Sequence, residues 1–212
     1  TNEEIEGDST RVYMTYQQFP KDVKVGERIL IDDGKLVLEV VETNEKDTVK
    51  AKTIQGGVLS SKKGVNLPNT NVSLPALTKK DIQDANFMLD LELDWIALSF
   101  VRHAQDIIDL KELIHNHPKG KNFKTPIIAK IEKPEGVKNI DEILEYCDGL
   151  MVARGDLGVE VPMEVVPAIQ KNLVAKARTY AKPVIIATQM METMINSLTP
   201  TRAEVNDVAN SV

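Results

Sequence analysis

The chain has 212 residues, of which 42% are hydrophobic and 27% charged, a composition typical of globular proteins that argues against disorder. Its apolar runs are far shorter than the roughly 20 residues of a membrane helix, and no apolar signal segment opens the chain. A net charge of −6 with 4% aromatic residues argues against nucleic-acid binding. The single cysteine, Cys147, fits a reducing compartment, so we expect a cytoplasmic protein.

The part of the chain before Pro75 has the pattern of short β-strands. Apolar and polar residues alternate over 12–16, 29–40 and 49–53, which is the period of a strand with one buried face. Within the second stretch, Asp33-Gly34 supplies the positive φ of a tight hairpin turn. These features predict a small all-β barrel domain.

After Pro75, short apolar runs alternate with helical patterns. The runs occupy 95–100, 127–131, 150–153 and 184–187. Alternation of this kind predicts an α/β fold with a parallel sheet. Four βα units are fewer than the eight of a closed barrel, so we expect a partial (β/α)8 TIM barrel. The predicted domains are therefore 1–75 and 76–212.

The helix boundaries carry their own signals. Thr78 followed by Asp81 predicts a helix cap, and Thr199 with Pro200 predicts the start of the last helix. The apolar stripe of that last helix continues to Val212 without a terminating residue, and the first residue is threonine. We interpret the chain as a segment of a longer protein.

Charged residues follow the apolar runs at the predicted carboxyl edge of the sheet. Lys130 and Glu132 are two residues apart and would share one strand face, and the same spacing relates Arg154 and Asp156 on the next strand. Glu132 and Asp156 could then hold Mg²⁺, which takes one or two protein carboxylates. Lys130 beside them suits an anion whose charge grows during reaction, such as a phosphoryl group or an enolate. A structural ion-pair network at the barrel rim would have the same spacing.

Four long motifs in the second part resemble the pyruvate kinase family. They are 127–132 (IIAKIE), 151–160 (MVARGDLGVE), 182–190 (KPVIIATQM) and 200–204 (PTRAE). Earlier in the chain, 31–34 (IDDG) and 62–68 (KKGVNLP) are similar to that family's mobile B domain. The resemblance extends over essentially the whole chain and preserves the order of the motifs.

The resemblance implies a role for several residues of the second part. Lys130 matches the catalytic lysine, which stabilises the phosphoryl group in transfer and the enolate left behind. Glu132 and Asp156 match the protein ligands of the catalytic Mg²⁺, and the backbone amides of Arg154, Gly155 and Asp156 match the cradle for the substrate carboxylate. Thr188 matches a residue near the methylene carbon that is associated with proton delivery.

For the first part, the resemblance implies a nucleotide site in a lid. Lys63 matches a lysine that binds nucleotide phosphate, and Asp33 matches a residue that faces the nucleotide metal. The implied reaction transfers the phosphoryl group of phosphoenolpyruvate to ADP, giving pyruvate and ATP, in a cytoplasmic homo-oligomer, a tetramer. The family's K⁺ site and a phosphate-binding arginine lie on barrel strands without a counterpart in these residues.

Two other functions remain open from the residues alone. A Mg²⁺-dependent lyase or aldolase that forms an enolate would use the same carboxylates and lysine, but it has no use for Lys63 or a nucleotide lid. The isolated chain could instead be a non-catalytic structural fragment that associates through exposed sheet edges.

Overall fold

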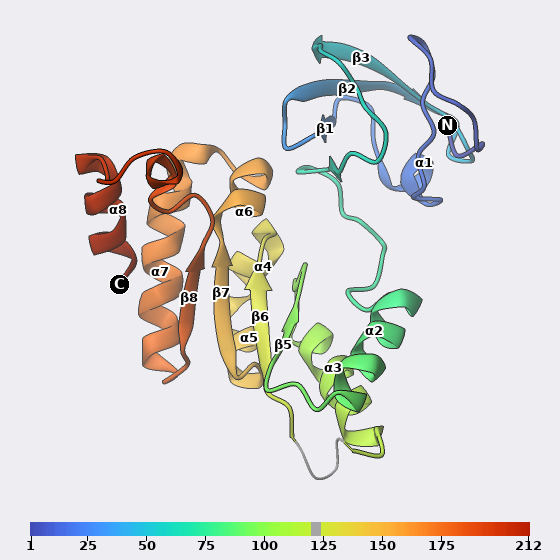
Figure 1. Cartoon of the computed structure of the whole chain (residues 1–212). Helices are drawn as coiled ribbons and strands as arrows, with labels where there is room; N and C mark the ends of the chain where they lie inside the picture. Colours follow the sequence, from blue (N-terminus) through green and yellow to red (C-terminus); the bar gives the residue numbers. More distant parts are fainter. Residues whose placement is uncertain (120–123) are drawn as a thin grey trace. The chain divides into compact units, whose positions relative to one another are not determined.

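The computed structural model describes residues 1–119 and 124–212 of the chain (Figure 1). These residues form two compact units, Thr1–Leu74 and Pro75–Val212, and each is described by itself. Together they show a mixed α/β protein in which one unit contains a parallel sheet.

The first unit is built on a four-stranded antiparallel sheet of order β3-β2-β1-β4. Its elements are α1 (Phe19–Asp22), β1 (Arg28–Ile31), β2 (Leu36–Thr43), β3 (Val49–Gln55) and β4 (Val65–Asn66). The buried side chains of this unit are Phe19, Val23, Ile29, Ile31, Leu36, Val40 and Leu67. The alternation of these positions along β1 and β2 gives the sheet one apolar face, as the period of two predicts.

The predicted hairpin turn joins β1 to β2. Ile31 pairs with Leu36, and the turn between them has φ values of 52° at Asp32, 57° at Asp33 and 81° at Gly34. Asp and Gly tolerate this left-handed conformation better than most residues. The predicted turn is therefore confirmed, although three consecutive residues and not only the Asp-Gly pair adopt positive φ.

The predicted strand over 12–16 is wrong. This segment has no strand, and its backbone makes isolated bonds such as Met14 N–H to the carbonyl of Thr1 at 2.8 Å. Met14 and Tyr16 still pack against the apolar cluster of the first unit. The alternating pattern therefore reflects side-chain burial in an irregular segment and not a paired strand.

The second unit contains a parallel sheet of order β5-β6-β7-β8, which confirms the predicted class of sheet. Its strands are β5 (Ile96–Leu98), β6 (Ile127–Ile131), β7 (Gly149–Ala153) and β8 (Val184–Ala187). The helices are α2 (Lys79–Asp90), α3 (Ala104–Asn116), α4 (Pro134–Lys138), α5 (Ile140–Tyr146), α6 (Arg154–Glu160), α7 (Val166–Thr179) and α8 (Arg202–Ser211). Short 3₁₀ turns occupy Met163–Val165 and Glu192–Ile195.

The core of this unit lies between the sheet and its helices, with α7 beside β7 and β8 (Figure 1). Helix α3 supplies Ile107, Leu110 and Ile114 to this core from one face, at the spacing of an amphipathic helix. Cys147, at the end of α5, is also fully buried, and this burial raises the pKa of its thiol to about 11. Parallel strands covered by helices account for the near-continuous apolar runs of the sequence.

Two helix starts test the predicted caps. Thr78 and Asp81 form a reciprocal capping box at α2, as predicted. The last helix, however, is capped by Thr201 and not by Thr199. The Thr201 hydroxyl accepts from the Glu204 N–H at 3.2 Å, and Glu204 accepts from the Thr201 N–H at 2.7 Å. Thr201 is the cap because Glu204, three residues later, completes a capping box with it.

Helix α4 approaches the backbone that follows β5 closely. A Cβ atom placed on Gly136, in the middle of α4, would lie 2.5 Å from the carbonyl oxygen of Val101. This distance is well inside van der Waals contact. The packing of α4 against the end of β5 therefore depends on glycine.

Candidate functional site

Lys130 and Glu132 meet where β6 ends. The side chains of Ile127, Ala129 and Ile131 are fully buried, while Lys130 alternates to the other face of the strand. Lys130 Nζ lies 2.6 Å from Glu132 Oε1 and 3.0 Å from Ser99 Oγ at the end of β5. The two residues therefore form an ion pair, as their spacing allows.

Glu132 is held on both of its carboxylate oxygens. Its side chain is only 2% exposed, and Oε2 accepts a hydrogen bond from the Phe100 N–H at 2.8 Å. Phe100 has φ of 56°, an uncommon conformation for an aromatic residue. Because a buried carboxylate requires polar partners, the Phe100 N–H after β5 and the Lys130 ammonium group together stabilise this charge.

The prediction that Arg154 and Asp156 share a strand face is wrong. Strand β7 ends at Ala153, and Arg154 begins helix α6. Residues two apart on a helix are separated by about 200° around its axis, so these side chains point in different directions. Leu157 and Glu160 are the buried residues of α6, and Asp156 is exposed. These two buried residues are three apart in the sequence, a spacing that places them on one face of a helix.

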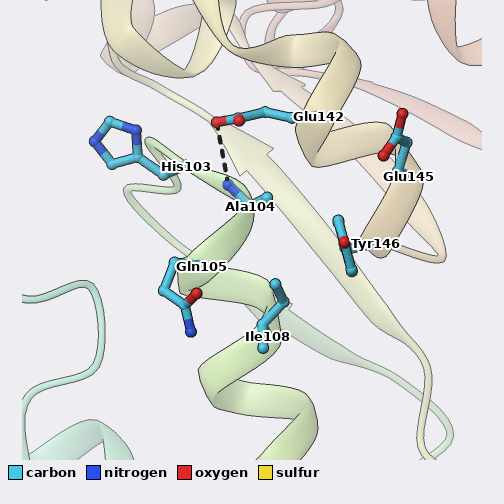
Figure 2. A pocket seen from close by; sticks show the side chains of 7 residues that line it. All are labelled: His103, Ala104, Gln105, Ile108, Glu142, Glu145 and Tyr146. Atoms are coloured by element: carbon cyan, nitrogen blue, oxygen red, sulfur yellow. Dashed lines mark hydrogen bonds between the residues drawn. The ribbon is translucent and has the colours of Figure 1, made fainter.

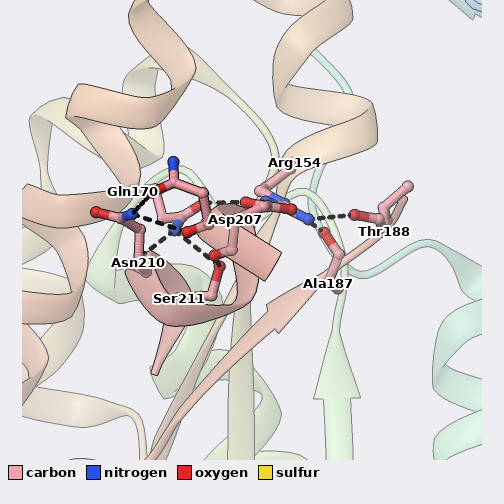
Figure 3. A network of polar contacts seen from close by, with 8 residues as sticks. Arg154, Gln170, Ala187, Thr188, Asp207, Asn210 and Ser211 are labelled. Carbon is pink, nitrogen blue, oxygen red and sulfur yellow. Dashed lines mark hydrogen bonds and ion pairs between the residues drawn. The ribbon is translucent and has the colours of Figure 1, made fainter. Parts of the chain in front are cut away.

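The side chain of Arg154 is held by β8 and α8 (Figure 3). Its Nη2 donates to the carbonyl oxygen of Thr188 at 2.6 Å, and Nη1 lies 2.6 Å from Asp207 Oδ1. Longer contacts of 3.4 Å join Nε to the Ala187 carbonyl and Nη1 to the Gln170 side chain. The guanidinium therefore contacts protein groups, which leaves the backbone amides of this segment as its predicted contribution to substrate binding.

Gly155 and Thr188 lie against each other. A Cβ atom on Gly155 would be 2.9 Å from Thr188 Cγ2, and the strand residues before them, Ala153 and Ala187, are paired in register. Thr188 is exposed and has φ of 82°. The structure thus brings together two residues predicted to contact substrate, at the carboxyl ends of adjacent strands.

Within the first unit, Lys63 and Asp33 lie near the same turn. Lys63 Nζ is 2.9 Å from Asp32 Oδ1, and Asp32 also pairs with Lys35 at 3.0 Å. Hydrogen bonds from these two lysines lower the pKa of Asp32. Asp33 itself is exposed at the turn. Pairing of Ile31 with Val65 explains why two segments more than 30 residues apart in sequence meet here.

Comparison with known proteins gives one result throughout. The family model for the pyruvate kinase barrel domain matches residues 1–212. The chain belongs to the pyruvate kinase family. It is 50% identical over 209 residues to the pyruvate kinase of Mycobacterium intracellulare, covering 99% of this chain and 43% of that protein. It is 48% identical over 212 residues to the pyruvate kinase of Corynebacterium glutamicum, covering 100% of this chain and 44% of that protein.

A third relative, pyruvate kinase 2 of Synechocystis, is 50% identical over 214 residues, which cover 100% of this chain and 35% of that protein. The chain therefore spans less than half the length of each of these relatives. In the described residues of this pyruvate kinase family member, each helix is too short or too polar to traverse a lipid bilayer.

The donor set of this pyruvate kinase family member fits Mg²⁺ chemistry. Glu132 and Asp156 follow the adjacent strands β6 and β7, and both offer the carboxylate oxygens that a hard cation prefers. Across residues 1–119 and 124–212, no three His, Cys, Asp or Glu side chains gather as a metal-binding group. Two carboxylates suffice for Mg²⁺, because it keeps several waters and takes further oxygens from substrate.

A pocket of about 450 Å³ lies between α3 and α5 (Figure 2). Its lining residues are His103, Ala104, Gln105, Ile108, Glu142, Glu145 and Tyr146. At its rim the Ala104 N–H donates to Glu142 Oε1 at 3.4 Å. None of the residues that line this pocket is among the site residues predicted for this chain.

Sequence reasoning assigned no role to three residues that contact the predicted site. Ser99 and Phe100 contact Lys130 and Glu132, and Asp207 contacts Arg154. The position of Ser99 and Phe100 at the end of the apolar run 95–100 is a usable signal, because parallel strands place their carboxyl ends at one edge. Asp207 has no such signal, since it lies on a helix 53 residues beyond its partner.

Proposed function

We propose that the full-length protein containing these residues transfers the phosphoryl group of phosphoenolpyruvate to ADP, giving pyruvate and ATP. The observation that carries this proposal is the Lys130–Glu132 ion pair at the end of β6. An ammonium group and a carboxylate at the carboxyl edge of a parallel sheet suit an anionic substrate with a metal ion. Membership of the pyruvate kinase family supports the choice of reaction.

In the proposed reaction, an oxygen of the ADP β-phosphate attacks phosphorus, and the bond from phosphorus to the enol oxygen breaks. The enolate then takes a proton at its methylene carbon and becomes pyruvate. Lys130 would stabilise the phosphoryl group and the enolate oxygen by charge, which is the main contribution a protein makes to phosphoryl transfer. Thr188 would hold or move the proton near the methylene carbon.

We propose Glu132 and Asp156 as the protein ligands of Mg²⁺, and a K⁺ site that lies largely outside this chain. When bound, Mg²⁺ would neutralise charge on the phosphoryl and enolate oxygens. Lys130 would then exchange its contact with Glu132 for one with the substrate. The backbone amides of Arg154, Gly155 and Asp156 would bind the substrate carboxylate.

The proposed architecture extends the observed α/β fold. The four strands β5 to β8 would form half of a (β/α)8 barrel, and the first unit would be a small β-barrel lid domain, the B domain, that closes over the substrates and excludes water. Lys63 would bind nucleotide phosphate there, and Asp33 would face the nucleotide metal. We propose a cytoplasmic homo-oligomer, a tetramer, as its working form.

The reaction is tested by measuring pyruvate formation from phosphoenolpyruvate by the full-length gene product. We expect formation to require ADP and Mg²⁺, and to fall in Lys130→Met but not in Lys176→Met. Lys176 is a suitable control because it makes a surface ion pair with Asp141 at 2.5 Å. An enolate-forming lyase or aldolase is the second candidate, favoured by the same carboxylates and lysine. Carbon–carbon cleavage without ADP would support it.

A non-catalytic isolated chain is the third alternative. Strands β5 and β8 lie at the edges of the parallel sheet within the described residues, and Ile185 on β8 is 42% exposed. Exposed apolar strands favour association. We therefore expect the isolated 212-residue chain to be inactive and to oligomerise or melt at low temperature. A cooperatively folding monomer in light scattering would contradict this expectation.

A further inference from the structure

The backbone that follows β8 is strained at the residue predicted to deliver a proton. Thr188 has φ of 82°, and Gln189 and Met191 follow with φ of 53° and 57°. The left-handed region is costly for a β-branched residue such as threonine, and it persists only where surrounding contacts impose it. The contacts that impose it on Thr188 therefore determine where its hydroxyl lies.

Arg154 contacts the Thr188 backbone directly. Its Nη2 donates to the Thr188 carbonyl oxygen at 2.6 Å, and its Nε reaches the Ala187 carbonyl at 3.4 Å. One planar guanidinium thus binds two consecutive carbonyls at the point where the strand ends. The fixed fork of donors makes arginine specific for such an arrangement, which a lysine cannot reproduce.

Asp207 fixes the orientation of that guanidinium from the opposite side (Figure 3). Asp207 Oδ1 lies 2.6 Å from Nη1, and the Arg154 side chain is only 14% exposed. Gln170, which is buried, contacts the same Nη1 at 3.4 Å and Ser211 Oγ at 3.2 Å. Arg154 therefore links Asp207 on helix α8 to the backbone of Thr188.

We propose that Arg154 and Asp207 are positioning residues that hold Thr188 in its left-handed conformation, and thereby place its hydroxyl for the proton step. This inference rests on the role given to Thr188 in the proposed function. Neither side chain needs to touch substrate, because the Arg154 guanidinium acts on the carbonyl of Thr188 and Asp207 acts on that guanidinium. The backbone of Gly155 also lies close to the Thr188 side chain, since a Cβ atom placed on Gly155 would be 2.9 Å from Thr188 Cγ2.

The proton step can be measured separately from phosphoryl transfer. In D₂O with Mg²⁺ and ATP, the full-length enzyme would exchange the methyl protons of pyruvate, and proton NMR follows the loss of the methyl signal. We expect Asp207→Asn to slow this exchange by about 10- to 100-fold, the scale of a small misplacement of a reacting group. The KM for phosphoenolpyruvate should change far less, because the metal ligands and Lys130 remain.

A double-mutant cycle separates positioning from general stabilisation. If Asp207 acts through Thr188, Asp207→Asn should have no further effect on exchange in a Thr188→Val background. Independent, multiplying effects would overturn the proposal. Asp141→Asn is the matched control. It also removes an ion pair between two helices, the pair of Asp141 on α5 with Lys176 on α7, and it should leave exchange unchanged.

Two further outcomes distinguish this inference from the proposed function. If Thr188→Val slows exchange and Asp207→Asn does not, the positioning role is wrong and the role of Thr188 stands. If Thr188→Val leaves exchange unchanged, the role of Thr188 is wrong and the inference fails with it. Should Asp207→Asn not fold, Arg154→Lys tests the same link, because lysine keeps the charge toward Asp207 and loses the bidentate geometry.

Discussion

Gly155 and Thr188 approach so closely that a Cβ on the glycine would lie 2.9 Å from Cγ2 of the threonine. The threonine side chain is short and branched, so it cannot move away as the end of a long side chain can. Gly155 lies in the first turn of α6, directly after β7, and Thr188 directly follows β8. Because both residues are predicted to contact substrate, a change in their separation would alter the geometry of the candidate site.

Gly155→Ala should disturb this contact. We expect a loss of about 1–3 kcal/mol in the free energy of unfolding, as for other overpacked positions, and a fall in kcat of the full-length protein. The matched control is Gly158→Ala on the same helix, where the new Cβ would lie 3.9 Å from Val166 Cγ2. Chemical denaturation of both variants checks the difference, and equal stabilities would contradict the close approach.

Lys130→Met should affect both catalysis and stability. We expect kcat to fall at least ~10²-fold, the scale of losing one preorganised electrostatic contact. Removing the lysine also leaves the buried Glu132 carboxylate without its ion pair, at a cost of about 3 kcal/mol. The double variant Lys130→Met/Glu132→Gln should recover stability but not activity. A variant with parental kcat and a lower Tm would show that Lys130 is only a structural partner.

The two proposed metal ligands should respond differently to neutralisation. Glu132→Gln and Asp156→Asn should both weaken Mg²⁺ binding, because an amide replaces a charged oxygen ligand. Only Glu132→Gln should lower the Tm, since Glu132 is buried and paired while Asp156 is exposed. Calorimetric titration with Mg²⁺ measures the first effect, and Glu145→Gln serves as a control. Unchanged binding in either variant would remove that residue from the metal site.

Glu204 should make the stability of the second unit depend on pH in acid. Hydrogen bonds from Thr193 and Thr201 lower the pKa of Glu204 from 4.5 to about 2. A carboxyl whose pKa is depressed by folding stabilises the protein above the pKa of the unfolded state, and this contribution is lost as the pH falls toward 2. Glu204→Gln should therefore be less stable than the parent at pH 6 and approach it near pH 2. Urea denaturation across this range measures the convergence.

The sequence predicts the local elements of this protein better than its distant contacts. Strands β6, β7 and β8 lie within one residue of their apolar runs, because burial between helices demands continuous apolar residues. The Lys130–Glu132 pair follows from strand periodicity alone. Such signals are local, so a single sequence contains them.

The errors arise where a local pattern has two structural solutions. Alternation of apolar and polar residues, as over 12–16, is compatible with an irregular segment as well as with a strand. Residues 154–156 directly follow a strand, but they lie in a helix. The Arg154–Asp207 ion pair cannot be predicted from spacing, because it depends on how α8 packs after a 53-residue separation. Tertiary packing decides each of these cases.

Gly136 limits how this gene can vary. Its Cβ position is 2.5 Å from the Val101 carbonyl oxygen, so the backbone of the neighbouring segment occupies the place of any side chain. Every missense change reachable by one nucleotide from a glycine codon introduces a Cβ atom. In a saturation mutagenesis library selected for function, this position should tolerate only synonymous codons, whereas Gly64, with no atom within 4 Å of its Cβ position, should accept alanine and serine.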